Sequence, residues 1–344
     1  MKRKNKKIIK FAVQFLLILL MAGILCYMFK DTYKDIFYQV KSSEKSIFIS
    51  TIILGNLYYF IDAFIYWSLL KKENCKINYF RCIALAYMSI FFNVTTFGVG
   101  IKPAQVAYLH RKKVDAGKAF GILTSPYVFS KVTIVIYAMV MLALNNKFVL
   151  DNFSNTFGYI YAGVGLSVII IVVLILVCSA AWFHKFISIL LDKILGRGKL
   201  AKYKLNDKIK AQLGLLHDAS CRIVRKPLEW FKFILINIIR QSCWYFIPVI
   251  AIFAMGGDLG EISVGEALTV TALMQLLMGV IPTSGGVGSL EVVFSVLFAV
   301  VFGKVTAGSC MIIYRLSTYY IPFIISIVIM SILEFDLRKI PEPE

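Results

Sequence analysis

The chain has 344 residues, of which 59% are hydrophobic, and it carries a formal net charge of +19. Soluble domains are about 45–50% apolar, and several runs here exceed the roughly 18 apolar residues that mark a membrane helix. The composition therefore excludes an ordinary soluble domain and predicts an all-α polytopic membrane protein. A membrane β-barrel would need alternating strands of about ten residues, and the sequence has none.

Six apolar runs predict full membrane spans, at about 8–29, 46–70, 119–144, 157–183, 233–255 and 308–333. The first run follows a basic start, but it is too long for the core of a signal peptide and lacks an A-x-A cleavage site. We therefore interpret it as a retained span.

A stretch at about 83–97 is apolar but short for a span, and it ends in the glycine-containing motif Thr95–Gly100, T-T-F-G-V-G. A helix at about 103–112 follows, with Pro103 in its first turn, where proline is well tolerated. Broken backbone at membrane depth is tolerated only where protein buries it or where it lines a wet cavity. We therefore expect a re-entrant hairpin here.

A motif of the same form, Thr283–Gly288 (T-S-G-G-V-G), separates the apolar stretches 264–281 and 288–302. This region is either a second re-entrant hairpin or two short spans. The two motifs would enter the membrane from opposite faces, which predicts an inverted repeat of the kind that places a transport site near the bilayer midplane. The alternative is two unrelated loops that both need glycine.

Between the fourth and fifth spans, the segment 184–231 is strongly basic. Phe186, Ile189, Leu190 and Ile194 share one face of a helix, so we interpret part of it as an amphipathic helix on the inner leaflet. A solvated linker is the alternative.

The positions of Lys and Arg predict both termini on the cytoplasmic side of a bacterial-type cell membrane. With this orientation, the inside segments hold 28 basic residues and the outside segments hold 6. The inside segments are 1–10, 71–82, 102–118, 184–231 and 334–344, and the outside segments are 30–45, 145–156, 256–263 and 303–307. The positive charge is thus interpreted as topology and attraction to anionic lipid, not as nucleic-acid binding.

No cofactor, metal or nucleic-acid partner is expected. The seven cysteines show no CxxC or Cys/His spacing of a metal site, and no GxxxxGK[ST] nucleotide-binding motif is present. The three histidines form no evident catalytic group with a carboxylate.

Helices that begin inside the membrane point their positive ends into a cavity and favour anions such as phosphate. Lys102 lies beside the first such helix, and Glu291 follows the second motif. Ionisable residues within spans are costly and are usually functional or paired. Those of the predicted spans are Lys131, Arg240, Arg315 and Asp62, with Asp62 as a possible charge partner. Snorkelling of Arg240 and internal ion pairing are the alternatives.

Three stretches resemble the lysylphosphatidylglycerol synthase transmembrane, or flippase-like, family. They are IPTSGGVGSLE (281–291), RLSTYYIPFIISI (315–327) and FGVGIKPAQVAYLHRKK (97–113). The resemblance implies a membrane domain that moves a lipid, such as an aminoacylated phosphatidylglycerol, between leaflets. It carries over Pro282, Thr283, Ser284, Gly285, Gly286, Gly288, Glu291 and Arg315 as site positions. With these, the expected headgroup site comprises Thr95, Gly98, Gly100, Lys102, Lys131 and Arg240.

Two-function members of that family also carry a large soluble aminoacyltransferase domain, whereas only 11 residues follow the last span here. We therefore expect a single membrane-embedded domain, 1–344, that is not itself an enzyme. The expected partners are membrane lipids, a separate lipid synthase and a second copy of the chain. The alternatives are a membrane component of lysylphosphatidylglycerol synthesis, a transporter of polyprenyl-phosphate glycolipids, and a small-solute transporter.

Overall fold

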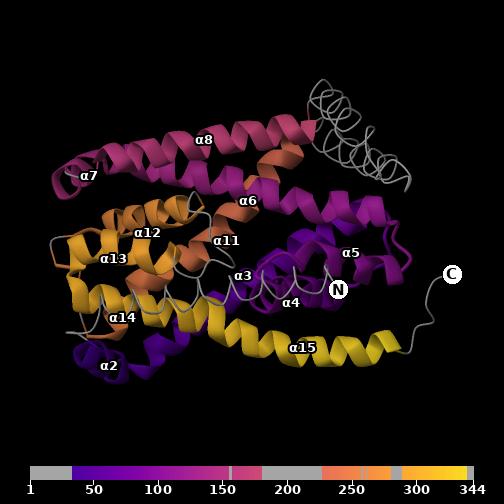
Figure 1. The fold of residues 1–344 in the computed structure, drawn as a ribbon, viewed down its shortest axis with the longest axis horizontal. Coiled ribbons are helices and arrows are strands. Elements are labelled where there is room, and N and C mark those ends of the chain that lie inside the picture. The colour runs from indigo at the N-terminus through magenta and orange to yellow at the C-terminus, as the bar shows by residue number, and fades with distance from the viewer. Residues whose placement is uncertain are drawn as a thin grey trace, which may run out of the picture. The chain divides into compact units, whose positions relative to one another are not determined.

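A computed structural model of the chain is helical wherever regular structure occurs in the residues that it describes (Figure 1). The described residues are 33–154, 157–179, 227–256, 259–260, 262–279 and 289–338. The predicted first span, most of the basic segment 184–231 and the second glycine motif lie outside them.

The helices follow the predicted spans closely. They are α2 (Tyr33–Lys41), α3 (Lys45–Lys72), α4 (Tyr79–Thr96), α5 (Ile101–Arg111), α6 (Ala116–Leu144), α7 (Asn146–Asn152), α8 (Phe157–Ser179), α11 (Pro227–Ala254), α12 (Val264–Met278), α13 (Ser289–Phe302), α14 (Lys304–Arg315), the π-helix η2 (Leu316–Tyr320) and α15 (Ile321–Arg338). The predicted all-α fold is confirmed.

Four helical segments in the described part are long and apolar enough to cross a membrane. They are Lys45–Lys72, Ala116–Leu144, Trp230–Ala254 and Lys304–Leu333. Shorter apolar helices accompany them, including α12 and α13. The chain is therefore a multi-pass membrane protein.

The chain divides into two compact units. Unit 1 comprises residues 1–57, 134–167 and 242–323, and unit 2 comprises 58–133, 168–241 and 324–344. The described segments expected outside, within 33–45, 145–154 and 303–307, all belong to unit 1. Those expected inside, within 71–82, 102–118 and 334–338, all belong to unit 2. The segments predicted on one side thus fall in the same unit, while the sides themselves stay a prediction.

In unit 2, α4 and α5 form the hairpin expected at the first glycine motif. Phe97 and Gly98 adopt left-handed backbone conformations, with φ of 53° and 83°, which end α4. The Thr96 hydroxyl accepts a hydrogen bond of 2.8 Å from the Gly100 amide. The Gln105 side chain of α5 then donates to the carbonyl of Leu85 on α4. The 11 residues of α5 extend only about 16 Å, so α5 is too short to cross the roughly 30 Å hydrocarbon core.

In unit 1, α12, α13 and α14 pack in sequence (Figure 1), and α3 approaches η2 very closely. A Cβ atom on Gly55 would lie 2.0 Å from the carbonyl oxygen of Ser317. The Thr51 and Ser317 hydroxyls are 2.9 Å apart, and the Trp244 indole donates to the Gly55 carbonyl. Short π-helical turns inside α-helices are frequent at functional sites, and this one begins directly after Arg315.

Gly55→Ala should destabilise the protein, because the new methyl group meets backbone that cannot move aside cheaply. We expect a loss of about 1–3 kcal/mol in the free energy of unfolding, measured by denaturant unfolding in detergent. The matched control is Gly165→Ala in α8, where nothing lies within 4 Å of the added Cβ. The control should keep or slightly raise stability, since alanine favours a helix; equal behaviour of the two variants would contradict the close approach.

Candidate functional site

A buried ion pair joins α11 to α3 in unit 2. The Arg240 guanidinium donates to Asp62 Oδ1, and the two side chains are only 4% and 9% exposed. The guanidinium also lies 4.8 Å from the ring centroid of Tyr58, one helical turn before Asp62. An isolated buried charge is strongly unfavourable, so Asp62 explains how Arg240 is accommodated. Arg240 Nε keeps no hydrogen-bond partner among the described residues.

Lys102 lies in the first turn of α5 and is held by uncharged oxygens. Its Nζ donates to the Leu123 carbonyl at 2.7 Å and to the Gln105 side-chain oxygen at 3.4 Å. Within the described part of the chain, no carboxylate forms an ion pair with it. Lys102 belongs to the same compact unit as Asp62 and Arg240. We call Lys102, Arg240 and Asp62 the unit 2 cluster; counted among the described residues, it has two cations and one carboxylate.

Lys131 on α6 is half-buried and lies 5.6 Å from the ring centroid of Tyr127. It too has no ion-pair partner in the residues that the structure describes. The neighbouring Ser130 accepts a hydrogen bond of 2.9 Å from Gln241 of α11. This contact ties α6 to the helix that carries Arg240.

A second buried ion pair lies in unit 1. Arg315 Nε donates to Glu291 Oε1 at 2.8 Å, and each side chain is 9% exposed. The Arg315 guanidinium lies 5.0 Å from the ring centroid of Tyr319. Gln275 of α12 donates to the hydroxyl of Tyr314 beside it. This pair is electrically balanced, unlike the cluster of unit 2.

The structure describes only some of the predicted site residues, and it brings only part of those together. Thr95, Gly98 and Gly100 form the turn before Lys102, and the Thr95 hydroxyl donates to the Phe91 carbonyl within its own helix. The positions Pro282, Thr283, Ser284, Gly285, Gly286 and Gly288 lie outside the described residues. Lys131 has no described hydrogen bond or ion pair to the Arg240–Asp62 pair.

Two contributors to the unit 2 cluster were not predicted from the sequence. Gln105 is fully buried and bridges Lys102 to the Leu85 carbonyl. Tyr66, on the same face of α3 as Asp62, is buried. The sequence does contain an indication of Tyr66, because Tyr58, Asp62 and Tyr66 are spaced four residues apart, which places them on one face of α3.

The described residues hold no group of three or more His, Cys, Asp or Glu side chains suited to a metal ion. In the loop between α3 and α4, partial burial raises the pKa of the Cys75 thiol, although Lys118 opposes the shift. A thiol with a raised pKa is a weak nucleophile.

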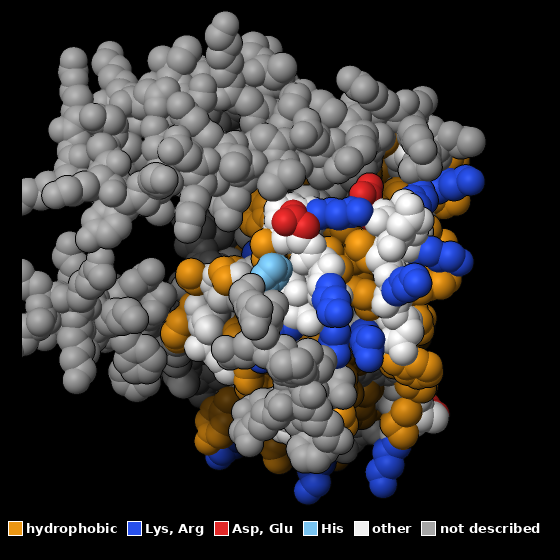
Figure 2. All heavy atoms as spheres, turned by 90° about the vertical axis from the view of Figure 1, so that its right-hand side faces the viewer, with side chains coloured by type: hydrophobic (Ala, Val, Ile, Leu, Met, Phe, Trp, Pro, Cys, Tyr) orange, Lys and Arg blue, Asp and Glu red, His pale blue; other side chains and the backbone are white. Residues whose placement is uncertain are grey.

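Basic residues gather at the ends of the helices of unit 2. Figure 2 shows Lys and Arg side chains spread over one face among apolar ones. The basic residues at these helix ends are Lys71, Lys72, Lys76, Arg81, Arg111, Lys112, Lys113 and Lys118. Lys118 forms an ion pair of 3.2 Å with Glu73. These residues belong to the segments for which the sequence predicts a cytoplasmic position.

The chain matches the family described as the lysylphosphatidylglycerol synthase TM region over residues 8–326. It therefore belongs to this family, as the motifs predicted. No individual curated protein matches the chain. Family membership and the long apolar helices agree on a membrane protein of the lysylphosphatidylglycerol synthase family.

The ion pair of unit 2 gives a test of stability. Asp62→Ala should lower the free energy of unfolding by about 3–5 kcal/mol, because it leaves Arg240 buried and unpaired. The double variant Asp62→Leu/Arg240→Met should regain most of that loss, since an apolar pair has no charge to desolvate. Asp151→Ala on the exposed surface of α7 is the control and should change stability little. An Asp62→Ala variant as stable as this control would show that the pair does not hold the unit together.

Proposed function

We propose that the protein moves an anionic or aminoacylated phospholipid, such as lysylphosphatidylglycerol, between the leaflets of a cell membrane. Lys102 and Arg240 of unit 2 bind the phosphate of its headgroup. The observation that carries the proposal is the Lys102 ammonium, which uncharged oxygens hold and which no carboxylate of the described residues pairs with. Family membership supports the lipid class.

The hydrogen bonds of Lys102 suit reversible binding of an anion. Carbonyl and amide oxygens hold its ammonium in place without cancelling its charge. A phosphate brings the missing negative charge, and charge-assisted hydrogen bonds are about twice as strong as neutral ones. The positive end of α5 adds to the attraction, and Arg240 Nε offers a further donor.

The basic face of unit 2 supports a cytoplasmic position for this cluster. Lys and Arg concentrate on the cytoplasmic side of membrane proteins, and the same residues attract anionic lipids of the inner leaflet. Lipid would thus be concentrated near the hairpin of α4 and α5. Exposure of the cluster to each leaflet in turn would move the headgroup while the acyl chains remain in lipid.

Lys102→Gln should reduce the rate of lipid movement by about 10- to 100-fold, the loss expected when one charged hydrogen bond of about 1.5–3 kcal/mol is removed. The measurement is headgroup flipping in proteoliposomes, with labelled phosphatidylglycerol and lysylphosphatidylglycerol and an impermeant reagent that scores the outer leaflet. Lys71→Gln, on the exposed end of α3, is the control and should keep nearly the full rate. A folded Lys102→Gln protein with the control's rate would refute this site, and a wild-type protein that accelerates neither lipid would refute the substrate class.

The pair of unit 1 is expected to act differently, as a structural tie between α13 and the end of α14. Arg315→Ala should destabilise the protein by about 3–5 kcal/mol, because it leaves Glu291 buried without its partner. The neutral pair Glu291→Gln/Arg315→Gln should restore most of the stability and retain at least half of the flipping rate. A well-folded neutral pair that moves no lipid would instead make Arg315 a ligand of the headgroup.

A further inference from the structure

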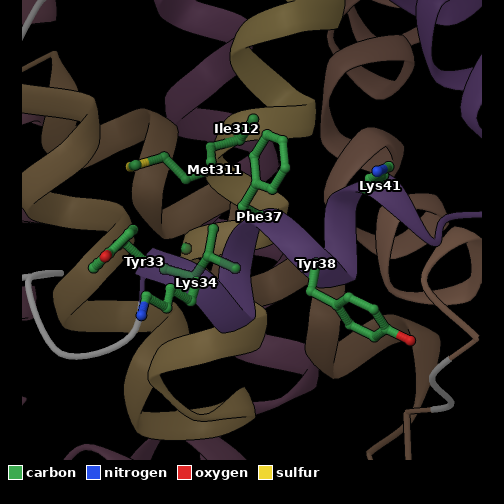
Figure 3. A pocket seen from close by; sticks show the side chains of 9 residues that line it. Tyr33, Lys34, Phe37, Tyr38, Lys41, Met311 and Ile312 are labelled. Carbon is green, nitrogen blue, oxygen red and sulfur yellow. The ribbon is translucent and has the colours of Figure 1, made fainter.

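A groove of about 650 Å³ lies between α2 and α14 in unit 1 (Figure 3). Its walls are fixed to each other, because α2 packs against α14 and Ser309 of α14 donates a hydrogen bond of 2.7 Å to Gln39 of α2. Ile36 anchors α2 as its only buried residue. The volume falls within the range of ligand pockets, about 300–1,000 Å³.

The floor of the groove is apolar. Figure 3 shows the ring of Phe37 beside Met311 and Ile312, and all three residues line the groove. Phe37 and Tyr38 are 69% and 74% exposed, which is far more than water would favour for rings of this size. Aromatic residues on a short amphipathic helix are typical of the membrane–water interface. The groove therefore opens toward lipid rather than toward bulk water.

The rim of the groove is basic. Lys34 and Lys41 both line it and lie seven residues apart, on one face of α2. Neither forms an ion pair within the described residues. Asp35 of the same helix does not line the groove. Two cations without an ion pair among the described residues match the phosphate of an anionic phospholipid, and the apolar floor matches its acyl chains.

We propose that this groove holds one anionic phospholipid, with its phosphate at Lys34 and Lys41 and an acyl chain along Phe37, Met311 and Ile312. The predicted topology places α2 on the outer side, so the bound lipid belongs to the outer leaflet. The site is separate from the cluster of Lys102 and Arg240, and its occupancy does not depend on lipid movement.

The test uses the full chain in nanodiscs in which phosphatidylglycerol is a minor component of phosphatidylcholine. Phe37 is replaced by the photoreactive residue p-benzoylphenylalanine, and mass spectrometry identifies the lipid that is crosslinked. Phosphatidylglycerol should be enriched about fivefold or more over its share of the bilayer, from the attraction of a lysine near the surface. The same substitution at Val300, an exposed residue of α13, should report the bulk composition.

Lys34→Gln/Lys41→Gln should return the crosslinks at Phe37 to the bulk composition, and Ile312→Trp should lower the total amount of crosslinked lipid by filling the groove. The flipping rate of the Lys34→Gln/Lys41→Gln protein should stay at the wild-type level, which separates this site from the proposed translocation site. Equal composition at Phe37 and Val300 would overturn the proposal. Crosslinks from Phe37 to the peptide 8–29 would also overturn it, because the chain's own first apolar segment would then occupy the groove.

Discussion

The pairing of ionised side chains away from water is the constraint on which the described structure depends. In unit 2, Arg240 of α11 meets Asp62 of α3, and in unit 1, Arg315 meets Glu291 of α13. In both, a tyrosine ring lies against the guanidinium. Tyr58 is one helical turn before Asp62, and Tyr319 is one turn after Arg315. A buried pair contributes little net stability, but a broken one is strongly destabilising. The pairs therefore fix which faces of these helices can meet, and the surrounding apolar contacts follow from that choice.

Lys102 is held in a different way from the two paired arginines. Carbonyl and amide oxygens accept two hydrogen bonds from its ammonium, so one of the three N–H donors and the positive charge are left over. A carboxylate in the same place would cancel that charge and would have to be displaced by any anionic ligand. Under the proposed function, these neutral oxygens would hold the ammonium in position before a phosphate binds. The hairpin turn at Phe97 and Gly98 supports this arrangement by starting α5 at that point.

Much of the fold could be predicted from the sequence, because long apolar runs have few alternatives in a membrane. The span predicted at 46–70 is α3, Lys45–Lys72, and the interrupted region at the first motif is the hairpin of α4 and α5. The pairing of side chains could not be predicted in the same way. Asp62 and Arg240 are 178 residues apart, and hydropathy does not fix how α3 and α11 are rotated about their axes. α2 escaped prediction because nine residues of mixed polarity resemble a loop.

The two glycine motifs are each followed by a helix with a charged residue in its first turn, but the charges are opposite. Glu291 in the first turn of α13 agrees with the positive end of a helix, whereas Lys102 in the first turn of α5 opposes it. The local cost of Lys102 is not recovered through an ion pair in the described part of the chain. A sequence selected only for stability would favour an acidic or neutral residue there. The proposed function offers a reason for Lys102 at this position, because the phosphate of a lipid headgroup would supply the negative charge that the described residues do not.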